Sequence, residues 1–165
     1  MLSVLIVCSA NICRSPMAEA LLKHLISGRP DASQWNIASA GTWARFGTPA
    51  AVLSQAVMNE RGLDISMHRS QPVTPELLPQ FDLVLTMEGQ HKEGLLLQYP
   101  IYANRIYMLS EMVGRSEDIS DPIGGELEDY QAAAKKMERF LSSGLDKIYL
   151  LASKNAKEIS SASVE

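Results

Sequence analysis

The first residues of the chain constrain its fold more than any other segment. Residues 2–7, LSVLIV, form a short apolar run rich in β-branched side chains. Such a run is typical of a strand buried inside a parallel sheet. A loop, CSANICR, follows it, and then Ser15 and Pro16 stand where the N-cap and first residue of a helix are expected. This order of strand, loop and helix predicts the first part of a βαβ unit.

Strand-like and helix-like patterns alternate along the rest of the chain. We expect further strands at 36–40, 81–87 and 105–109, and helices from Ser15 to Gly28, from Thr48 to about Arg61, over 90–98 and over 127–150. Alternation of this kind predicts an α/β fold with a parallel sheet and helices on both faces. The length of 165 residues suits one domain. We assign that domain to residues 1–152 and expect a polar, frayed tail at 153–165.

Composition narrows the functions open to the chain. The formal net charge is −4 and the sequence pI is about 5.4, which argues against nucleic acid as a partner. No apolar run is long enough for a membrane span, and Arg14 ends the N-terminal run too early for a signal peptide. The two cysteines, Cys8 and Cys13, make neither a disulfide framework nor a zinc site. We therefore expect a cytoplasmic protein without a metal.

The loop after the first strand has the spacing of an anion-binding site. Cys8 and Arg14 are separated by five residues at the carboxyl end of a strand, where ligands bind in parallel sheets. Backbone N–H groups in such a loop converge on an anion, and the positive end of the following helix favours a thiolate at the base of the loop. An arginine can hold two phosphoryl oxygens side by side. We assign substrate binding to the intervening residues, which are Ser9, Ala10, Asn11, Ile12 and Cys13.

Hydrolysis through a thiolate also needs a proton donor for the leaving group. Asp121 is the best candidate, because it stands in the loop SDPIGG just before the last predicted helix. Alone, an aspartate in such a turn would more simply be a turn residue. Its combination with the Cys8–Arg14 loop favours a general acid.

Several stretches together resemble one enzyme family. VCSANICRSPMAEALL at the N-terminus, SAGT at 39–42, HRS at 68–70, FDLVLTM at 81–87 and DP at 121–122 are similar, in order and approximate spacing, to the low-molecular-weight protein-tyrosine phosphatases. The resemblance implies a three-layer α/β/α sandwich around a four-stranded parallel sheet, a Rossmann-like phosphatase fold. It implies no metal and no cofactor.

The same resemblance implies a role for each residue of the loop. Cys8 would be the nucleophile that forms a phosphocysteine, Arg14 would bind the phosphate, and Asp121 would act as general acid and then as general base. Asn11 would hold the loop in a strained backbone shape, and Ser15 would hydrogen-bond the Cys8 thiolate. Cys13 would be the redox partner, able to form a reversible disulfide with Cys8.

Two departures from the family pattern bear on the substrate, which we expect to be a phosphorylated protein. Ala10 replaces the usual glycine, at some cost if that position needs a positive φ. The stretches DPIGGELEDY and TMEGQHKEG are closer to bacterial protein-arginine phosphatases, which typically have a threonine in place of Ile12. Ile12 itself, with Trp43 as a candidate aromatic wall, favours phosphotyrosine. We therefore predict phosphotyrosine hydrolysis, with phosphoarginine as the alternative.

Two rival functions fit the same loop. An arsenate reductase would need further cysteines near residues 82–90, and the sequence has none there. A catalytically silent phosphate-binding module would typically have lost Cys8 or Asp121. Among the remaining candidates, we expect a structural role for His68, helix-surface positions for His24 and His91, and core packing for Tyr130.

Overall fold

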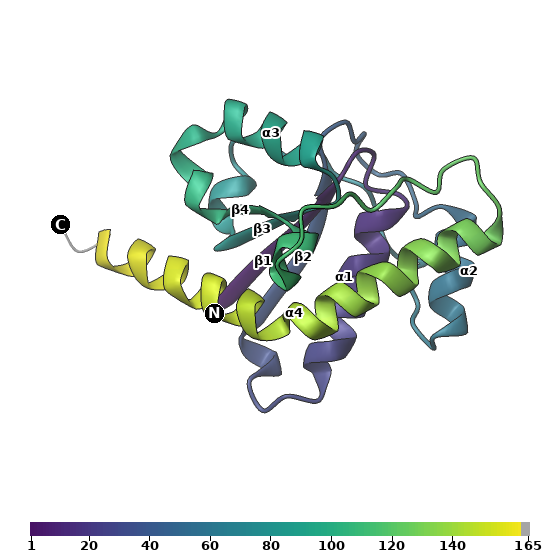
Figure 1. Cartoon of the computed structure of the whole chain (residues 1–165), viewed down its shortest axis with the longest axis horizontal. Coiled ribbons are helices and arrows are strands. Elements are labelled where there is room, and N and C mark those ends of the chain that lie inside the picture. The colour runs from purple at the N-terminus through teal and green to yellow at the C-terminus, as the bar shows by residue number, and fades with distance from the viewer. Residues whose placement is uncertain (163–165) are drawn as a thin grey trace.

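The computed structural model describes the backbone of residues 1–162 and the side chains of residues 1–157. Strands and helices alternate along the chain (Figure 1). The strands are β1 (Leu2–Cys8), β2 (Trp35–Gly41), β3 (Leu83–Thr86) and β4 (Ile106–Met108). The helices are α1 (Arg14–Ser27), α2 (Val52–Glu60), α3 (Gly89–Gln98) and α4 (Leu127–Ala162). Short 3₁₀ turns, which include Leu78–Gln80 and Pro100–Arg105, connect several of them.

The four strands form one parallel sheet in the order β2-β1-β3-β4. β1 pairs with β2 on one side, from Leu2 opposite Trp35 to Cys8 opposite Gly41, and with β3 on the other. The chain therefore leaves β1 in one direction and later returns to its opposite side. The carboxyl end of β1 lies at this change of direction, which is where open α/β sheets bind ligands.

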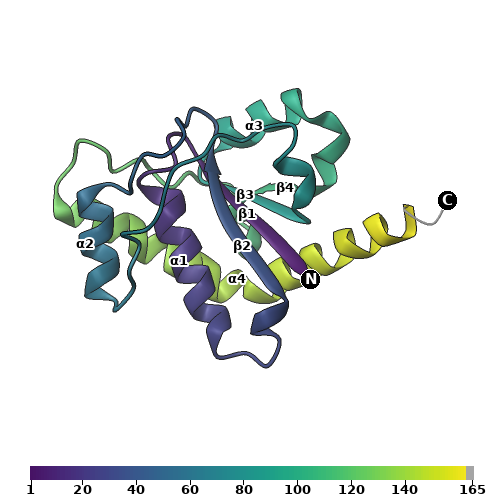
Figure 2. The same cartoon turned by 180° about the vertical axis from the view of Figure 1, so that it is seen from behind.

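Both faces of the sheet are covered by helices. Val4 and Ile6 of β1 point into a core shared with α1, α2 and α4, while Leu5 and Val7 point into a second core shared with α3. This alternation follows from the two-residue period of a strand. Figures 1 and 2 show α3 on one side of the sheet and the other three helices on the opposite side. The predicted three-layer α/β/α sandwich is confirmed.

The starts of two helices differ from the sequence prediction. α1 begins at Arg14 with Cys13 at the cap position, and no side chain caps it. Ser15 was predicted to be the N-cap and instead points into the preceding loop. α2 begins at Val52 rather than near Thr48, because the preceding segment is held extended by other contacts, including a hydrogen bond from Ala51 N to the Ile12 carbonyl at 2.8 Å.

The end of α4 also differs from the prediction. The helix continues to Ala162, past the predicted end at Leu150 and through most of the segment expected to be frayed. Asn155 is buried, and its Nδ2 donates to the carbonyl oxygen of Asp82 at 2.8 Å. This contact attaches the C-terminal part of the helix to the amino end of β3. The polar composition of residues 153–165 gives no sign of this contact.

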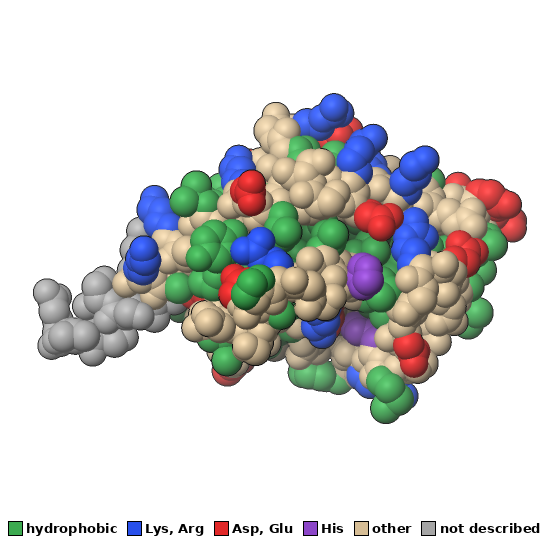
Figure 3. All heavy atoms as spheres, turned by 90° about the horizontal axis from the view of Figure 1, so that it is seen from below, with side chains coloured by type: hydrophobic (Ala, Val, Ile, Leu, Met, Phe, Trp, Pro, Cys, Tyr) green, Lys and Arg blue, Asp and Glu red, His purple; other side chains and the backbone are tan. Residues whose placement is uncertain are grey.

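Charged groups are mixed over the surface. On the face seen in Figure 3, basic and acidic side chains are interspersed, with hydrophobic groups between them, and no single basic patch dominates. This distribution accords with the net charge of −4. Within the described part of the chain, no helix is long and apolar enough to cross a membrane.

Candidate active site

Cys8 ends β1 and lies almost completely buried at the base of the loop that leads to α1. Its Sγ is 3.0 Å from Ser15 Oγ, in the first turn of that helix. Ser15 Oγ in turn accepts a hydrogen bond from Asn11 Nδ2 at 2.8 Å. A hydroxyl that accepts from an amide keeps its own hydrogen for another partner. Ser15 is thus arranged to donate to the sulfur of Cys8.

Asn11 fixes the shape of the loop. It is fully buried and is the one residue other than glycine with a positive φ, 58°, in the described part of the chain. Its Nδ2 also donates to Ser39 Oγ at 2.9 Å, and its Oδ1 accepts from Gln71 N at 3.0 Å. His68 Nε2 lies 2.7 Å from the Asn11 carbonyl oxygen. These contacts, from segments far apart in the sequence, hold a strained backbone in place.

The position of Ala10 needs no glycine, because Ala10 does not have a positive φ. The expected cost of the alanine there does not arise. The close approach occurs instead at Gly41, at the end of β2. A Cβ on Gly41 would stand 2.3 Å from the Ser9 carbonyl oxygen and 3.0 Å from Asn11 N. The glycine of the SAGT stretch therefore lets β2 lie directly against the loop.

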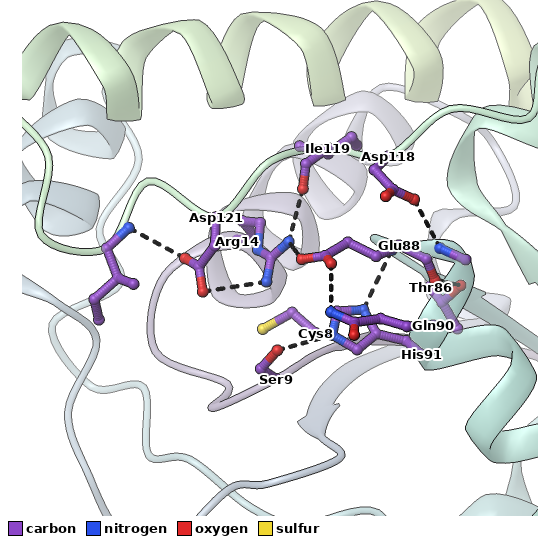
Figure 4. Close-up of polar contacts among 12 residues, drawn as sticks. Cys8, Ser9, Arg14, Thr86, Glu88, Gln90, His91, Asp118, Ile119 and Asp121 are labelled. Atoms are coloured by element: carbon purple, nitrogen blue, oxygen red, sulfur yellow. Dashed lines mark hydrogen bonds and ion pairs between the residues drawn. The ribbon is translucent and has the colours of Figure 1, made fainter.

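Arg14 is buried and its guanidinium is held by three acceptors. Nη1 donates to the Glu88 carboxylate and to the Ile119 carbonyl oxygen, the latter at 2.7 Å, and Nη2 is 3.3 Å from Asp121 Oδ2. Nε has no hydrogen-bond partner within the described residues. In Figure 4 the guanidinium lies between Asp121 and Glu88, with Cys8 beneath it. An oxyanion above Cys8 would supply the acceptor that Nε lacks.

Glu88 is a site residue that the sequence analysis missed. It lies two residues after the end of β3 and forms the ion pair with Arg14. Burial alone would raise the pKa of Glu88, but the hydrogen bond and charge of Arg14 outweigh it and lower that pKa. Glu88 is therefore ionised and partly balances the buried guanidinium. The signal in the sequence was an acidic residue just after a predicted central strand.

Asp121 faces Arg14 from the loop that precedes α4. Its side chain is about one-third exposed, and its Oδ1 accepts from Ile123 N at 3.2 Å. The loop is fastened at Ile119, whose N donates to the Met87 carbonyl at 2.9 Å, and at Asp118, whose carbonyl accepts from Lys136 Nζ at 2.9 Å. A carboxyl group is thus held at the open side of the cradle. That position suits a group that exchanges protons with a leaving group and with water.

Cys13 points away from the open side of the loop. It is buried, and its Sγ lies 3.6 Å from Tyr130 Oη in α4. Burial raises the pKa of the Cys13 thiol, and burial likewise raises the pKa of Tyr130. Cys13 is therefore a neutral thiol beside Cys8. Both cysteines are free, and the redox role of Cys13 stays a prediction.

Trp43 and Ile12 lie on different sides of the loop. The Trp43 side chain is 88% exposed, while its backbone N donates to the Ser9 carbonyl at 2.8 Å. It lines a shallow hollow beside the loop, together with Ser9 and Thr42. Ile12 is half-buried and packs on the larger core. Trp43 thus lies next to the loop, and its role as an aromatic wall stays a prediction.

His91 is buried, so the prediction that it lies on the helix surface is wrong. It occupies the third position of α3, and its Nδ1 accepts from Glu88 N at 3.2 Å in a capping box. Its Nε2 is 2.8 Å from Ser9 Oγ. The order of the sheet brings the start of α3 beneath the loop, and a helical pattern alone does not reveal this. His68, predicted to be structural, does contact the loop through Asn11.

The arrangement brings together a buried thiol, a loop that can receive an anion, a fixed guanidinium and a carboxyl group. No group of three or more histidine, cysteine, aspartate or glutamate side chains among the described residues could hold a metal ion. The chemistry that these side chains support is nucleophilic attack on a bound oxyanion, with proton transfer at the open side.

Comparison with known proteins defines the family. The family model for low molecular weight phosphotyrosine protein phosphatase matches residues 3–156. This chain therefore belongs to the low molecular weight phosphotyrosine protein phosphatase family.

Two of the similar proteins are named for different substrates. The chain is 35% identical to a probable low molecular weight protein-tyrosine-phosphatase, EpsP of Ralstonia nicotianae, over 90% of this chain and 97% of that protein. It is 34% identical to a protein-arginine-phosphatase of Bacillus subtilis, over 85% of this chain and 92% of the relative.

The similar solved structures likewise include a tyrosine phosphatase and an arginine phosphatase. A mutant of YwlE from Bacillus subtilis superposes with a TM-score of 0.84 at 31% identity, covering 90% of this chain and 99% of its own. A low molecular weight protein tyrosine phosphatase from T. tengcongensis has a TM-score of 0.81 at 37% identity, covering 89% and 99%. In another YwlE structure, an arginine phosphatase mutant with serine in place of the active-site cysteine carries a phosphoryl group on that serine.

Proposed function

We propose that this chain is a phosphoprotein phosphatase that hydrolyses phosphotyrosine through a phosphocysteine on Cys8. The observation that carries the proposal is Arg14, which is buried above Cys8 and fixed by Glu88 and Asp121, with Nε unpaired. A buried guanidinium with a free donor beside a thiol suits a phosphoryl group during its transfer, when its negative charge is spread over three oxygens.

The reaction has two steps. In the first, the Cys8 thiolate forms a bond to phosphorus while the ester bond breaks, and Asp121 gives its proton to the departing phenolic oxygen. In the second, Asp121 takes a proton from a water molecule, whose oxygen attacks phosphorus and breaks the S–P bond. Inorganic phosphate leaves, and the thiolate and the protonated Asp121 are restored.

The preference for phosphotyrosine rests on two side chains. Ile12 is apolar and belongs to the loop that would surround the phosphate. Trp43 exposes an indole ring beside Ser9, where it could pack against a phenyl ring. The similarity to a probable protein-tyrosine-phosphatase, at 35% identity, supports the assignment.

Phosphoarginine is the second candidate, and the loop after Asp121 favours it. Gly124, with a φ of 78°, and Gly125 follow where an aromatic wall would otherwise stand. The similarity to the Bacillus subtilis protein-arginine-phosphatase, at 34% identity, points the same way. The carboxylate of Asp121 could also accept hydrogen bonds from a guanidinium.

A side-by-side assay separates the two substrates. We would measure kcat/KM of the parent and of Ile12→Thr on a phosphotyrosine peptide and a phosphoarginine peptide of otherwise equal sequence, with Cys8→Ala as the inactive control. The proposal expects the parent to prefer phosphotyrosine and Ile12→Thr to shift the ratio toward phosphoarginine. A parent that already prefers phosphoarginine would replace the first candidate with the second.

The rival functions have separate tests. The chain contains two cysteines, so a thioredoxin-linked arsenate reductase would lack the further thiol that passes a disulfide outward. Reduction of arsenate in the presence of an added thiol would support the arsenate reductase hypothesis. A silent phosphate-binding module would bind phosphate but leave p-nitrophenyl phosphate intact.

The remaining expectations concern partners and location. A phosphorylated protein is the proposed partner, with its phosphate in the loop. A nucleophilic thiolate beside a second thiol needs a reducing compartment to stay active, so we propose a cytoplasmic location.

A further inference from the structure

A small hollow adjoins the loop from Cys8 to Arg14, here called the anion loop, on the side away from Asp121. Its volume is about 320 Å³, and its lining includes Ser9, Thr42, Trp43, Gln90, His91 and Gln98. None of these side chains is acidic or basic except the histidine. Thr42 N and Trp43 N are hydrogen-bonded to the carbonyl oxygens of Cys8 and Ser9, so the hollow is built directly onto the loop.

The tautomer of His91 follows from its partners. Glu88 N is a backbone N–H and can only donate, so Nδ1 of His91, 3.2 Å away, must accept and cannot carry a hydrogen. In the neutral ring the hydrogen is then on Nε2, which donates to Ser9 Oγ at 2.8 Å. The residue is 4% exposed, so bulk water does not compete for these contacts.

The surroundings favour this neutral ring. Burial lowers the pKa of His91, and the nearby positive charge of Arg14 adds to the effect. Glu88, Asp118 and Asp121 oppose it, since negative charges favour the protonated ring. The net direction is downward, in agreement with the geometry.

The orientation of the Ser9 hydroxyl follows from this tautomer of His91. Its oxygen already accepts a hydrogen bond from His91, so the hydroxyl retains its own hydrogen and one lone pair for another partner. Ser9 also lines the hollow beside Trp43. A group bound there would meet a hydroxyl whose position is fixed by a buried ring rather than one free to rotate.

We propose that His91 is a positioning residue for Ser9, and that the Ser9 hydroxyl contacts the group that carries the phosphate, so that the pair determines part of the substrate specificity. The inference rests on the proposed function. His91 acts on the substrate through Ser9, while the hydrogen bond from Glu88 N holds the ring in the tautomer that donates to Ser9. Pre-orientation of this kind reduces the ordering cost of the contact when substrate binds.

A double-mutant cycle tests this coupling. The variants are Ser9→Ala, His91→Leu and the double variant, with His24→Leu at an exposed histidine as the control. The first readout is kcat/KM on the phosphotyrosine peptide and the phosphoarginine peptide. The second is the inhibition constant of inorganic phosphate, which fills the loop but has no group to place in the hollow.

We expect each single variant to lose about three- to tenfold in kcat/KM on the better peptide, the scale of one hydrogen bond. The double variant should lose no more than either single variant, because His91 acts through Ser9. Inorganic phosphate should inhibit all of them within about twofold of the parent. His91→Gln, whose amide can accept from Glu88 N and donate to Ser9, should recover most of the loss.

Three results would overturn the inference. Additive losses would mean that His91 does not act through Ser9, and unchanged kcat/KM in Ser9→Ala would mean that the hydroxyl contacts nothing. A parallel loss of phosphate inhibition would show that the pair merely shapes the loop. A parent that binds phosphate but hydrolyses neither peptide would instead contradict the proposed function, and this inference with it.

Discussion

Arg14 shows how much of the site depends on a single side chain. A buried guanidinium is costly unless it is paired and fully hydrogen-bonded. Here Glu88 supplies an acceptor from the end of β3, and Asp121 and the Ile119 carbonyl supply two more from the loop before α4. The loop could be recognised from the spacing of Cys8 and Arg14 because that spacing is local. Glu88 could not, because its contact depends on which strand lies beside β1.

Asp121 gives the first prediction at this scale. Asp121→Asn cannot donate a proton, so it should lose at least about tenfold more kcat on phenyl phosphate, whose leaving group is poor, than on p-nitrophenyl phosphate. The amide still fits beside Arg14, which limits structural damage. The measurement is a set of kcat values over aryl phosphates of graded leaving-group pKa. Equal losses on all of them would remove Asp121 as the acid.

Cys13 gives the second prediction. If it protects Cys8 by forming a disulfide, the parent should regain most of its activity when a thiol reductant follows brief peroxide treatment. Cys13→Ser should recover much less, because an unprotected sulfenic acid is oxidised further to irreversible forms. Residual activity after reduction is the readout. Recovery of the variant as full as that of the parent would rule out the redox role.

At the scale of elements, the contacts between segment ends decide what sequence patterns can reveal. The alternation of strands and helices predicted the layers, since hydrophobic period is a local property. The predicted helix boundaries were less accurate. α2 starts only at Val52, after Ala51 N, which donates to the Ile12 carbonyl oxygen. α4 continues to Ala162, and Asn155 in its C-terminal part donates to the Asp82 carbonyl oxygen. These hydrogen bonds join segments that are distant in the sequence, so no local sequence pattern predicts them.

The contact between β2 and the loop yields a third prediction. Gly41→Ala should lower the free energy of unfolding by about 1–3 kcal/mol, because its Cβ would meet the Ser9 backbone at 2.3 Å. It should also weaken inhibition by inorganic phosphate, since the loop must shift. The control is Gly28→Ala, where a Cβ would meet nothing within 4 Å. Denaturant titration of both variants compares them. Similar stabilities for the two would contradict the close approach.

At the scale of the whole molecule, the sheet order β2-β1-β3-β4 assembles the site. It places the ends of β1 and β3 side by side, and with them the anion loop and the start of α3. The loop before α4 then closes over Arg14. A fold class inferred from periodicity does not fix this order, which is why His91 was expected on the surface.

The pH dependence of stability is a fourth prediction. The pKa of His91 is lowered from its ordinary value of 6.5 by burial and by Arg14, so the unfolded chain takes up a proton near pH 6.5 while the folded chain does not. The free energy of unfolding should therefore fall as pH decreases from about 7 to about 5, by at most about 1.4 kcal/mol per pH unit for this group. Denaturant titrations of the parent and of His91→Gln should show a flatter profile for the variant. Identical slopes would mean that His91 titrates normally.

The central claim is a phosphocysteine on Cys8, and a quenched intermediate tests it most directly. The Asp121→Asn variant, which slows the second step, is mixed with p-nitrophenyl phosphate, whose good leaving group spares the first step, and quenched within one turnover. Intact-mass and peptide-mass measurements then locate the phosphoryl group. The control is Asp121→Asn combined with Cys8→Ala, because a serine in the active site becomes phosphorylated in a YwlE mutant. We predict one phosphoryl group on the peptide that contains Cys8 and none in the control. Turnover by Asp121→Asn without any labelled Cys8, or the same label in the control, would contradict the mechanism.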